Sequence, residues 1–272
     1  SSGKKGNLSS FVENPNFHEV KCDVTDYESL KSIFENFNFD IVFHNAASKK
    51  NICLKDPRRD LEINAGGTYN ILHLSQHFNV KKVVHASTGS VYGEAQYFPQ
   101  DEAHPLVPLS FYGVSKLAGE KYCKMFSEVF GLNTTVLRYF HVYGSRQESD
   151  DSLGGVISIF LRRAAEGLPL IIHGDGTQQR SFTHVSDVVG INLLVATHPD
   201  TKGEVYNCAS GINVTVQELA ELVRSYTDKE LEIVYDDWLV GDIKVFNIDN
   251  SKIKSLGFKF QTSFKKDVGE LL

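Results

Sequence analysis

The chain has 272 residues, of which 41% are hydrophobic and 23% charged, and this composition suits a globular protein with a substantial core. A formal net charge of −6 at pH 7 argues against nucleic acid and anionic membranes as main partners. The sequence has no apolar run of about 18 residues and no signal-peptide pattern, so we expect a cytoplasmic protein without membrane spans.

The predicted elements alternate between strands and helices. We expect strands over 17–22, 40–47, 81–88 and 133–144, and helices over 27–37, 63–78 and 110–130. Strands that are apolar throughout and separated by helices indicate a doubly wound parallel sheet, hence an α/β fold. After residue 145 a helix over 154–167, a Gly-rich turn over 173–182 and shorter elements indicate a smaller α/β part.

Three of the strand ends carry small or polar residues: Asn45–Ala47, Ser87–Gly89 and Tyr139–His141. In parallel sheets, ligands bind beyond the carboxyl ends of the strands. We therefore expect these three segments to line one crevice.

A dinucleotide-binding sheet of this type usually opens with a strand, a glycine-rich turn and a helix that receives the pyrophosphate. The first residues, SSGKKGNLSS, do not have this pattern. Either that unit lies outside the numbered chain, or the protein lacks it.

Tyr112 and Lys116 stand four residues apart at the start of the predicted long helix, so they share one face of it. A nearby ammonium favours the phenolate form of a tyrosine and lowers its pKa toward the range useful for proton transfer. The preceding strand ends in Ser87-Thr88, which offers a second hydroxyl for the same substrate oxygen.

Other candidate sites have weaker support. The four cysteines lack C-x-x-C spacing, which favours buried thiols in a reducing compartment over disulfides or zinc. His73 and His77 have a metal-compatible spacing, but no third ligand is evident, so we predict solvent-facing side chains and no metal site.

Together these motifs resemble the extended short-chain dehydrogenase/reductases, in the NAD-dependent nucleotide-sugar epimerase/dehydratase branch, near UDP-glucose 4-epimerase-like proteins. The resembling segments run through nearly the whole chain in family order: CDVTD, DIVFHNAA, N-x-x-G-T-x-N, STGSVYG, YGVSK, LRYFHVYG and GDGTQQRSFTHVSD. The resemblance also implies that about 30–40 residues with the glycine fingerprint precede Ser1.

The resemblance assigns roles by position. It implies that Thr88, Tyr112 and Lys116 are catalytic, with Tyr112 as the base, and that NAD is the cofactor. The residues implied for cofactor binding are Asp23, Val24, Ala46, Ala47, Lys49, Asn64, Tyr112, Lys116 and Tyr139. Those implied for binding a nucleotide-sugar, most simply a UDP-sugar, are Thr88, His141, Arg180 and Asp242.

The family resemblance also implies a division of the chain and a homodimer. Residues 1–144 and 183–206 would form the Rossmann-like NAD-binding domain, and residues 145–182 and 207–272 the substrate domain. The dimer would pack through the Tyr112-bearing helix and the helix around 65–78.

Gly89 and Ser90 separate the possible reactions. Related 4,6-dehydratases carry an acidic pair at these two positions, which drives the elimination of water, whereas an epimerase does not need it. The sequence therefore predicts a 4-epimerase that inverts the sugar C4 hydroxyl through a 4-keto intermediate. A 4,6-dehydratase or ketoreductase on the same scaffold, or a non-enzymatic nucleotide-sugar or redox sensor, remain the alternatives.

Two departures from the family pattern leave the sugar and the nucleotide open. His141 stands where relatives usually have Asn, and Leu239 stands where an Arg commonly precedes the Gly-Asp pair that ends in Asp242.

Overall fold

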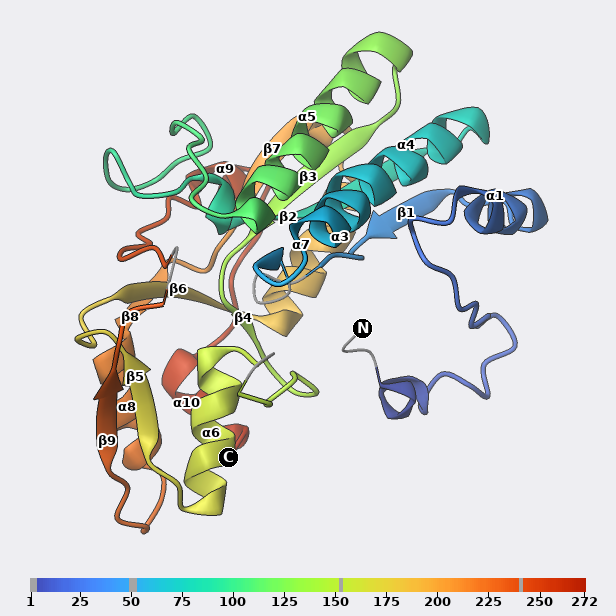
Figure 1. Cartoon of the computed structure of the whole chain (residues 1–272). Coiled ribbons are helices and arrows are strands. Elements are labelled where there is room, and N and C mark those ends of the chain that lie inside the picture. Colours follow the sequence, from blue (N-terminus) through green and yellow to red (C-terminus); the bar gives the residue numbers. More distant parts are fainter. Residues whose placement is uncertain (1–3, 49–52, 152–153, 240–241) are drawn as a thin grey trace.

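The computed structural model describes residues 4–48, 53–151, 154–239 and 242–272 (Figure 1). Four parallel strands form the central sheet in the order β1-β2-β3-β7. They are β1 (Ile41–His44), β2 (Lys82–Thr88), β3 (Thr134–Tyr139) and β7 (Glu204–Cys208). The predicted parallel sheet is therefore confirmed.

Helices cover both faces of this sheet because successive residues of its inner strands are apolar on both sides. Val83 and Val136 belong to the core beneath the helices of one face, whereas their neighbours Val84 and Leu137 pack against α7 on the other. The helices of the first face are α1 (Tyr27–Asn36), α4 (Gly67–His77) and α5 (Phe111–Phe130), and α7 spans Val185–Thr197 (Figure 1).

A second core holds together the smaller part of the molecule, around Phe160, Phe182 and Leu219. Its strands are β4 (Val142–Tyr143), β5 (Leu170–His173), β6 (Gln179–His184), β8 (Ile212–Thr215) and β9 (Ile233–Asp236). They form a sheet β4-β6-β8 and a pair β5-β9. Its helices are α6 (Val156–Glu166), α8 (Val216–Arg224) and α10 (Phe264–Glu270).

Short helical segments complete the described chain: η1 (Lys5–Leu8), α3 (Pro57–Leu61), the π-helical η2 (Glu62–Gly66), η3 (Gly89–Val91), η4 (Pro199–Thr201) and α9 (Ser251–Ser255). The helix expected over 63–78 thus has an earlier start at α3 and passes through a π-helical turn. That turn brings Asn64 into the interior.

The strand predicted over 17–22 is wrong. This segment has no regular structure and no ladder with another strand in the described part of the chain. A strand needs a neighbour for its backbone N–H and C=O groups. In Figure 1 the segment before α1 loops out below β1, which is one of the two edge strands of the sheet, and among the described residues β1 pairs with β2 alone.

The strand predicted over 133–144 is interrupted between β3 and β4. His141 has φ of +27°, a conformation that a strand does not adopt, and the chain bends there into the smaller part. The Gly-rich turn predicted over 173–182 ends early, since β6 begins at Gln179 and includes Arg180.

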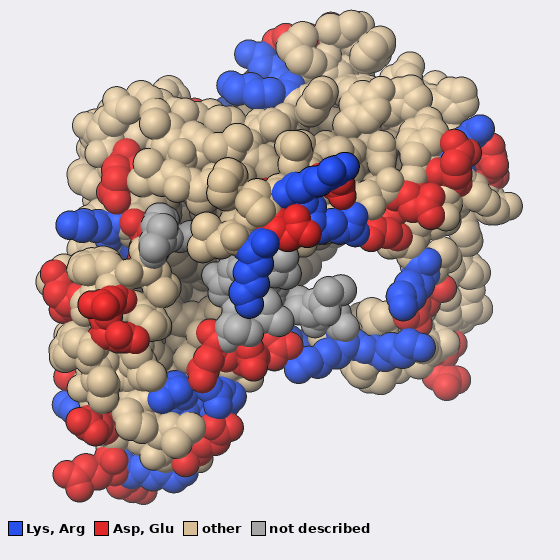
Figure 2. Space-filling model, viewed as in Figure 1, with Lys and Arg blue, Asp and Glu red and all other residues tan. Residues whose placement is uncertain are grey.

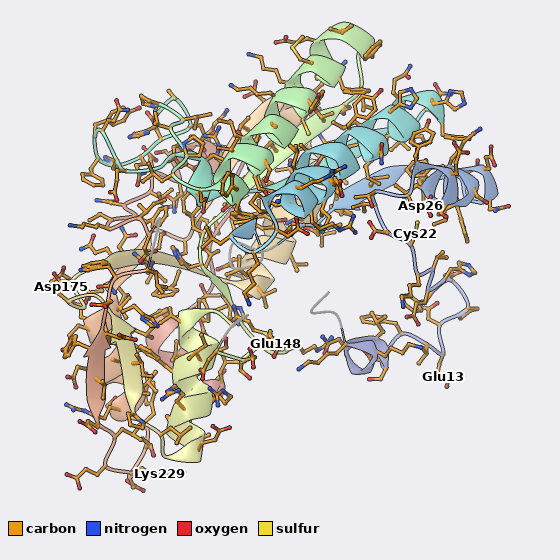
Figure 3. All side chains as sticks on the ribbon, in the orientation of Figure 1. Glu13, Cys22, Asp26, Glu148, Asp175 and Lys229 are labelled. Atoms are coloured by element: carbon orange, nitrogen blue, oxygen red, sulfur yellow. The ribbon has the colours of Figure 1, made fainter. Side chains whose placement is uncertain are left out.

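The surface in Figure 2 shows acidic and basic side chains interspersed, with no continuous basic stripe on the visible face. Figure 3 shows Glu148 where the N-terminal segment meets the loop after β4, and its carboxylate pairs there with Lys4 at 3.3 Å. Among the described residues, no helix is both long and apolar enough to cross a bilayer.

Candidate active site

The strand β2 ends at Thr88, and the chain turns there into η3. The Thr88 hydroxyl accepts a hydrogen bond from the Ser90 amide at 3.2 Å and so caps that short helix. A Cβ at Gly89 would lie 2.3 Å from the Phe140 ring, so a larger residue does not fit without movement of that ring. The Thr88 hydroxyl is therefore fixed at the carboxyl end of a central strand.

The helix α5 begins beside this turn. Ser110 caps it by accepting a hydrogen bond from the Gly113 amide at 3.1 Å. Gly113 packs so closely on the turn that a Cβ there would lie 2.7 Å from the Ser90 carbonyl oxygen. This contact places the Tyr112 hydroxyl in hydrogen-bonding reach of Thr88. The structure thus brings together the two hydroxyls that the sequence singled out.

Burial controls the acidity of the Tyr112–Lys116 pair. It raises the pKa of Tyr112 to about 12, and the hydrogen bond with Thr88 opposes this rise. Burial therefore sets the net direction of the shift, and the expectation that Lys116 lowers this pKa stays a prediction. Lys116 itself is 1% exposed, and burial lowers its pKa to about 8.

A cavity of about 200 Å³ opens beside Thr88. Two of the predicted strand ends line it, one from β2 and one from β3, and a C-terminal segment closes its far side. Its lining residues are Thr88, Gly89, Ser90, Tyr139, Phe140, His141, Asp242, Ile243 and Phe246. Four of the predicted site residues, Thr88, Tyr139, His141 and Asp242, therefore share one cavity.

Arg180, predicted to hold a diphosphate, lies next to this cavity and is 7% exposed. Its guanidinium donates to the Asp242 carboxylate at 2.5 Å and to the Ile243 carbonyl at 2.8 Å. Arg180 and Asp242 thus form one anchored ion pair at the cavity wall.

The residues predicted for the adenine side of a cofactor lie near the start of α4. Asp23 is half-exposed, accepts hydrogen bonds from the backbone and side chain of Thr25, and pairs with Arg59; the Thr25 hydrogen bonds chiefly lower its pKa. Val24 packs on Gly67, where a Cβ would lie 2.6 Å from its side chain.

The residues predicted for the pyrophosphate side follow β1. Ala46 and Ala47 are exposed. Asn45, before them, accepts a hydrogen bond from the Tyr139 hydroxyl at 3.3 Å. Lys49 lies outside the described residues.

Asn64 is completely buried and fully engaged with protein. Its side-chain oxygen accepts from the Ser48 amide at 2.8 Å, and its amide nitrogen donates to Asp60 at 2.9 Å and Ser115 at 3.0 Å. The structure therefore shows Asn64 joining the loop after β1 to α5, and its predicted contact with the cofactor stays a prediction.

Sequence reasoning missed a buried ionic network directly behind the site. Arg138 of β3 donates to both carboxylate oxygens of Glu120 on α5, at 2.7 and 3.0 Å, and both residues are almost fully buried. Glu120 also accepts from the Ser87 hydroxyl at 2.5 Å. Each member stands next to, or one turn from, a predicted site residue. The one available signal was an arginine inside an otherwise apolar strand.

A pair of buried histidines was also missed. The rings of His44 on β1 and His85 on β2 stack with centroids 5.3 Å apart, and His44 contacts the Thr68 hydroxyl at 3.0 Å. Burial lowers the pKa of His44 to about 3 and that of His85 well below its ordinary value, with Lys116 adding to both shifts. Both imidazoles are therefore neutral in the folded protein.

Acidification is expected to destabilise the fold through these two histidines. In the unfolded chain a histidine titrates near pH 6.5, so the unfolded state takes up protons before the folded state does. Their contribution to the free energy of unfolding is complete above pH 6.5 and is lost as the pH falls from there, in the case of His44 down to its folded-state pKa of about 3. The loss is about 1.4 kcal/mol per pH unit for each histidine.

Urea unfolding between pH 7.5 and 5 measures this slope. His44→Gln should reduce the slope, whereas His18→Gln, at an exposed position, should leave it unchanged. Equal slopes in the wild type and His44→Gln would contradict the assignment.

The remaining candidates are the cysteines and the His73–His77 pair. The four cysteines, all within the described chain, form no disulfide. His73 is half-buried rather than solvent-facing, and its ring contacts the Tyr27 hydroxyl at 2.9 Å. Over the residues that the structure describes, no cluster of three or more His, Cys, Asp or Glu side chains is arranged to hold a metal ion.

Comparison with known proteins identifies the family. The model of the NAD dependent epimerase/dehydratase family matches residues 3–209. The chain belongs to this family. The predicted class of enzyme, its Rossmann-like fold and its NAD dependence are therefore confirmed.

Individual relatives match over most of their length. A Methanocaldococcus jannaschii protein provisionally named UDP-glucose 4-epimerase is 36% identical over 271 residues, which cover 98% of this chain and 85% of the relative. The Thermotoga maritima UDP-glucose 4-epimerase, solved with UDP-glucose, has a TM-score of 0.93 and 34% identity over 100% of this chain and 86% of its own. A Bacillus cereus UDP-glucuronic acid 4-epimerase, solved with UDP-glucuronic acid and NAD, has a TM-score of 0.90 and 28% identity over 98% of this chain and 83% of its own.

Proposed function

We propose that the protein is a UDP-sugar 4-epimerase in which Tyr112 is the proton-transferring base. The observation that carries this proposal is the pairing of the Tyr112 hydroxyl with Thr88, which lines a cavity whose adjoining turn, Gly89 and Ser90, contains no carboxylate. NAD, when bound, would supply the hydride-transfer chemistry at C4 of the sugar. The proton of the C4 hydroxyl is then transferred by side chains of the protein.

In this mechanism the C4 hydroxyl lies between Thr88 and Tyr112. With its pKa raised to about 12, Tyr112 rests as a neutral phenol, so the phenolate has to form when the substrate binds. Thr88 favours that form by hydrogen bonding, and the Lys116 ammonium supplies positive charge one turn away. Tyr112 takes the proton of the C4 hydroxyl, holds it while the 4-keto sugar turns over, and returns it to the C4 oxygen when hydride is restored to the opposite face of C4.

Elimination of water is disfavoured by the turn that follows Thr88. The dehydratase reaction needs a carboxylic acid at this turn, which here contains Gly89 and Ser90. The Phe140 ring occupies the space that a side chain at Gly89 would need. This favours epimerisation over the 4,6-dehydratase alternative.

The nucleotide part of the substrate is assigned to Arg180, Asp242 and His141. A guanidinium donates two parallel hydrogen bonds to phosphate oxygens, and Arg180 has to exchange part of its contact with Asp242 for a diphosphate. His141 lines the same cavity at the position of the usual family asparagine.

The cofactor contacts are assigned to residues that fit a dinucleotide. Asp23 presents a half-exposed carboxylate for hydroxyl or amino groups, and Ala46 and Ala47 leave room for close approach. Tyr139, which lines the cavity, and Lys116, one helical turn after Tyr112, are assigned to the nicotinamide end of the cofactor. Accordingly, residues 1–144 and 183–206 form the cofactor domain and residues 145–182 and 207–272 the substrate domain, interlocked where β4 pairs with β6.

We also propose that two copies pack through α4 and α5. These helices expose large apolar side chains along one face: Tyr69, Val114, Tyr122, Met125 and Val129. Contiguous apolar surface of this kind marks an interaction site. Sedimentation should give about twice the 30.4 kDa chain mass, and Val129→Glu should return the monomer. A cytoplasmic location is consistent with four cysteines that form no disulfide.

The central experiment incubates the protein with NAD and UDP-glucose, UDP-N-acetylglucosamine or UDP-glucuronate, and identifies the products by NMR and mass spectrometry. The expected result is the C4 epimer with unchanged mass. A product lighter by one water would establish the dehydratase alternative. Tight binding without turnover of any of the three would favour a sensor.

A further inference from the structure

The Lys116 ammonium lies in the interior, and a buried charge is costly unless another charge balances it. Titratable groups face it from four elements. They are Asp60 on α3, Glu120 and Cys123 on α5, His44 on β1 and His85 on β2.

Most of these groups cannot balance the charge of Lys116. The Glu120 carboxylate is bound at both oxygens by Arg138, which already neutralises it. Burial keeps the two imidazoles neutral, and it raises the pKa of the Cys123 thiol, which stays protonated. Asp60 therefore remains: burial raises the pKa of its carboxyl group, and the neighbouring Lys116 charge acts in the opposite direction, in favour of the carboxylate.

Asp60 is 1% exposed. Its carboxylate accepts a hydrogen bond from the neutral Asn64 amide at 2.9 Å. Among the described residues no Lys or Arg forms an ion pair with Asp60; its neighbour Arg59 pairs instead with Asp23 and Glu62.

We propose that Asp60 is the counter-charge of Lys116 and a positioning residue for the Tyr112–Lys116 pair. The link is also mechanical, because Asn64 bonds both Asp60 and Ser115, and Ser115 lies in the helical turn between Tyr112 and Lys116. The kinetic part of this proposal rests on the proposed function; the electrostatic part does not.

Loss of the Asp60 charge has a distinctive consequence. A nearby negative charge raises the pKa of a lysine and of a tyrosine alike, and Asp60 acts on both Lys116 and Tyr112. The other groups that face Tyr112 are Thr88 and Cys53. Asp60→Asn should therefore move both limbs of the pH–rate profile to lower pH, by about one unit. A residue with only a structural role would lower the rate without moving the limbs.

A double-mutant cycle tests the electrostatic link without any activity measurement. The wild type, Asp60→Asn, Lys116→Met and the double variant are unfolded in urea at pH 7.5. If the two changes acted independently, their separate effects on the folding equilibrium constant would multiply. We expect the double variant to have a folding equilibrium constant at least about tenfold higher than this product, because each single change leaves one buried charge without its partner. Glu62→Gln, at an exposed position two residues along the chain from Asp60, should show no such coupling to Lys116→Met.

The kinetic arm compares the pH–rate profiles of the wild type and Asp60→Asn with UDP-glucose and NAD. Additive effects in the cycle would overturn the assignment of Asp60 as counter-charge, whether or not the protein epimerises UDP-glucose. If the cycle shows coupling but the limbs of the pH–rate profile of Asp60→Asn do not move, Asp60 has no positioning role in the reaction. Absence of turnover in the wild type would instead contradict the proposed function and leave the cycle to decide about Asp60.

Discussion

Replacing Tyr112 with phenylalanine is expected to lower kcat for UDP-sugar epimerisation by about 10³-fold, within the range that general acid–base catalysis contributes. The change removes only the hydroxyl that bonds to Thr88, and the ring keeps its place at the start of α5. UDP binding, measured by calorimetry, should change by less than about twofold, since Arg180 and Asp242 lie on the other side of the cavity.

Tyr122→Phe is the matched control. It removes the same atom from the same helix, but its side chain is 43% exposed and outside the cavity. Its kcat should equal that of the wild type. Comparable losses in the two variants, or full activity of Tyr112→Phe, would remove Tyr112 from the mechanism.

Glu120→Gln is expected to lower the free energy of unfolding by about 3–5 kcal/mol, because it leaves the buried Arg138 guanidinium without its counter-charge. The pair is bidentate, at 2.7 and 3.0 Å, with both side chains under 5% exposed. Urea unfolding measures the loss.

Glu128→Gln on the same helix provides the comparison. Its pairing with Lys124, at 3.6 Å, is exposed, and such pairs contribute about 0–1 kcal/mol. In addition, the variant with both Glu120→Gln and Arg138→Met should lose less free energy of unfolding than the sum of the losses in the two single variants. Similar losses in Glu120→Gln and Glu128→Gln would show that burial does not govern the energy of these pairs.

The strands and helices of the central sheet could be predicted because the residues that specify them lie within each element or at its ends. The strand β2 contains the β-branched pair Val83-Val84, and α5 begins after a serine cap and is terminated by Gly131, which has φ of +72°. The segment 17–22 has a similar composition but depends on a neighbouring strand, and pairing is not a property of the segment itself. Its predicted strand failed for that reason.

The catalytic candidates Thr88, Tyr112 and Lys116 came from motif spacing and family resemblance, and the structure places Thr88 and Tyr112 in contact. The groups behind them could not be found in this way. Whether Asp60, His44 or Arg138 is buried depends on contacts between residues far apart in the chain, such as the bond from Asn64 to Ser115. The acidity of Tyr112 likewise depends on how much water the whole fold excludes.

The contact between Gly89 and Phe140 bears on how this scaffold could acquire another reaction. Ser90 can be exchanged for an acid by one substitution, but Gly89 cannot, since its missing Cβ would fall 2.3 Å from an aromatic carbon. An ancestor on the way to a dehydratase would first have to shrink Phe140, a ring with 1% exposure that also packs against Tyr92 and Phe246. The intermediate with a smaller residue at 140 carries a core cavity and gains no new chemistry, with an expected cost of about 3–5 kcal/mol for a phenylalanine truncated to alanine. A change from 4-epimerase to 4,6-dehydratase chemistry on this fold thus needs a smaller residue at position 140 as well as an acid at position 89. The first of these changes alone lowers the stability of the protein.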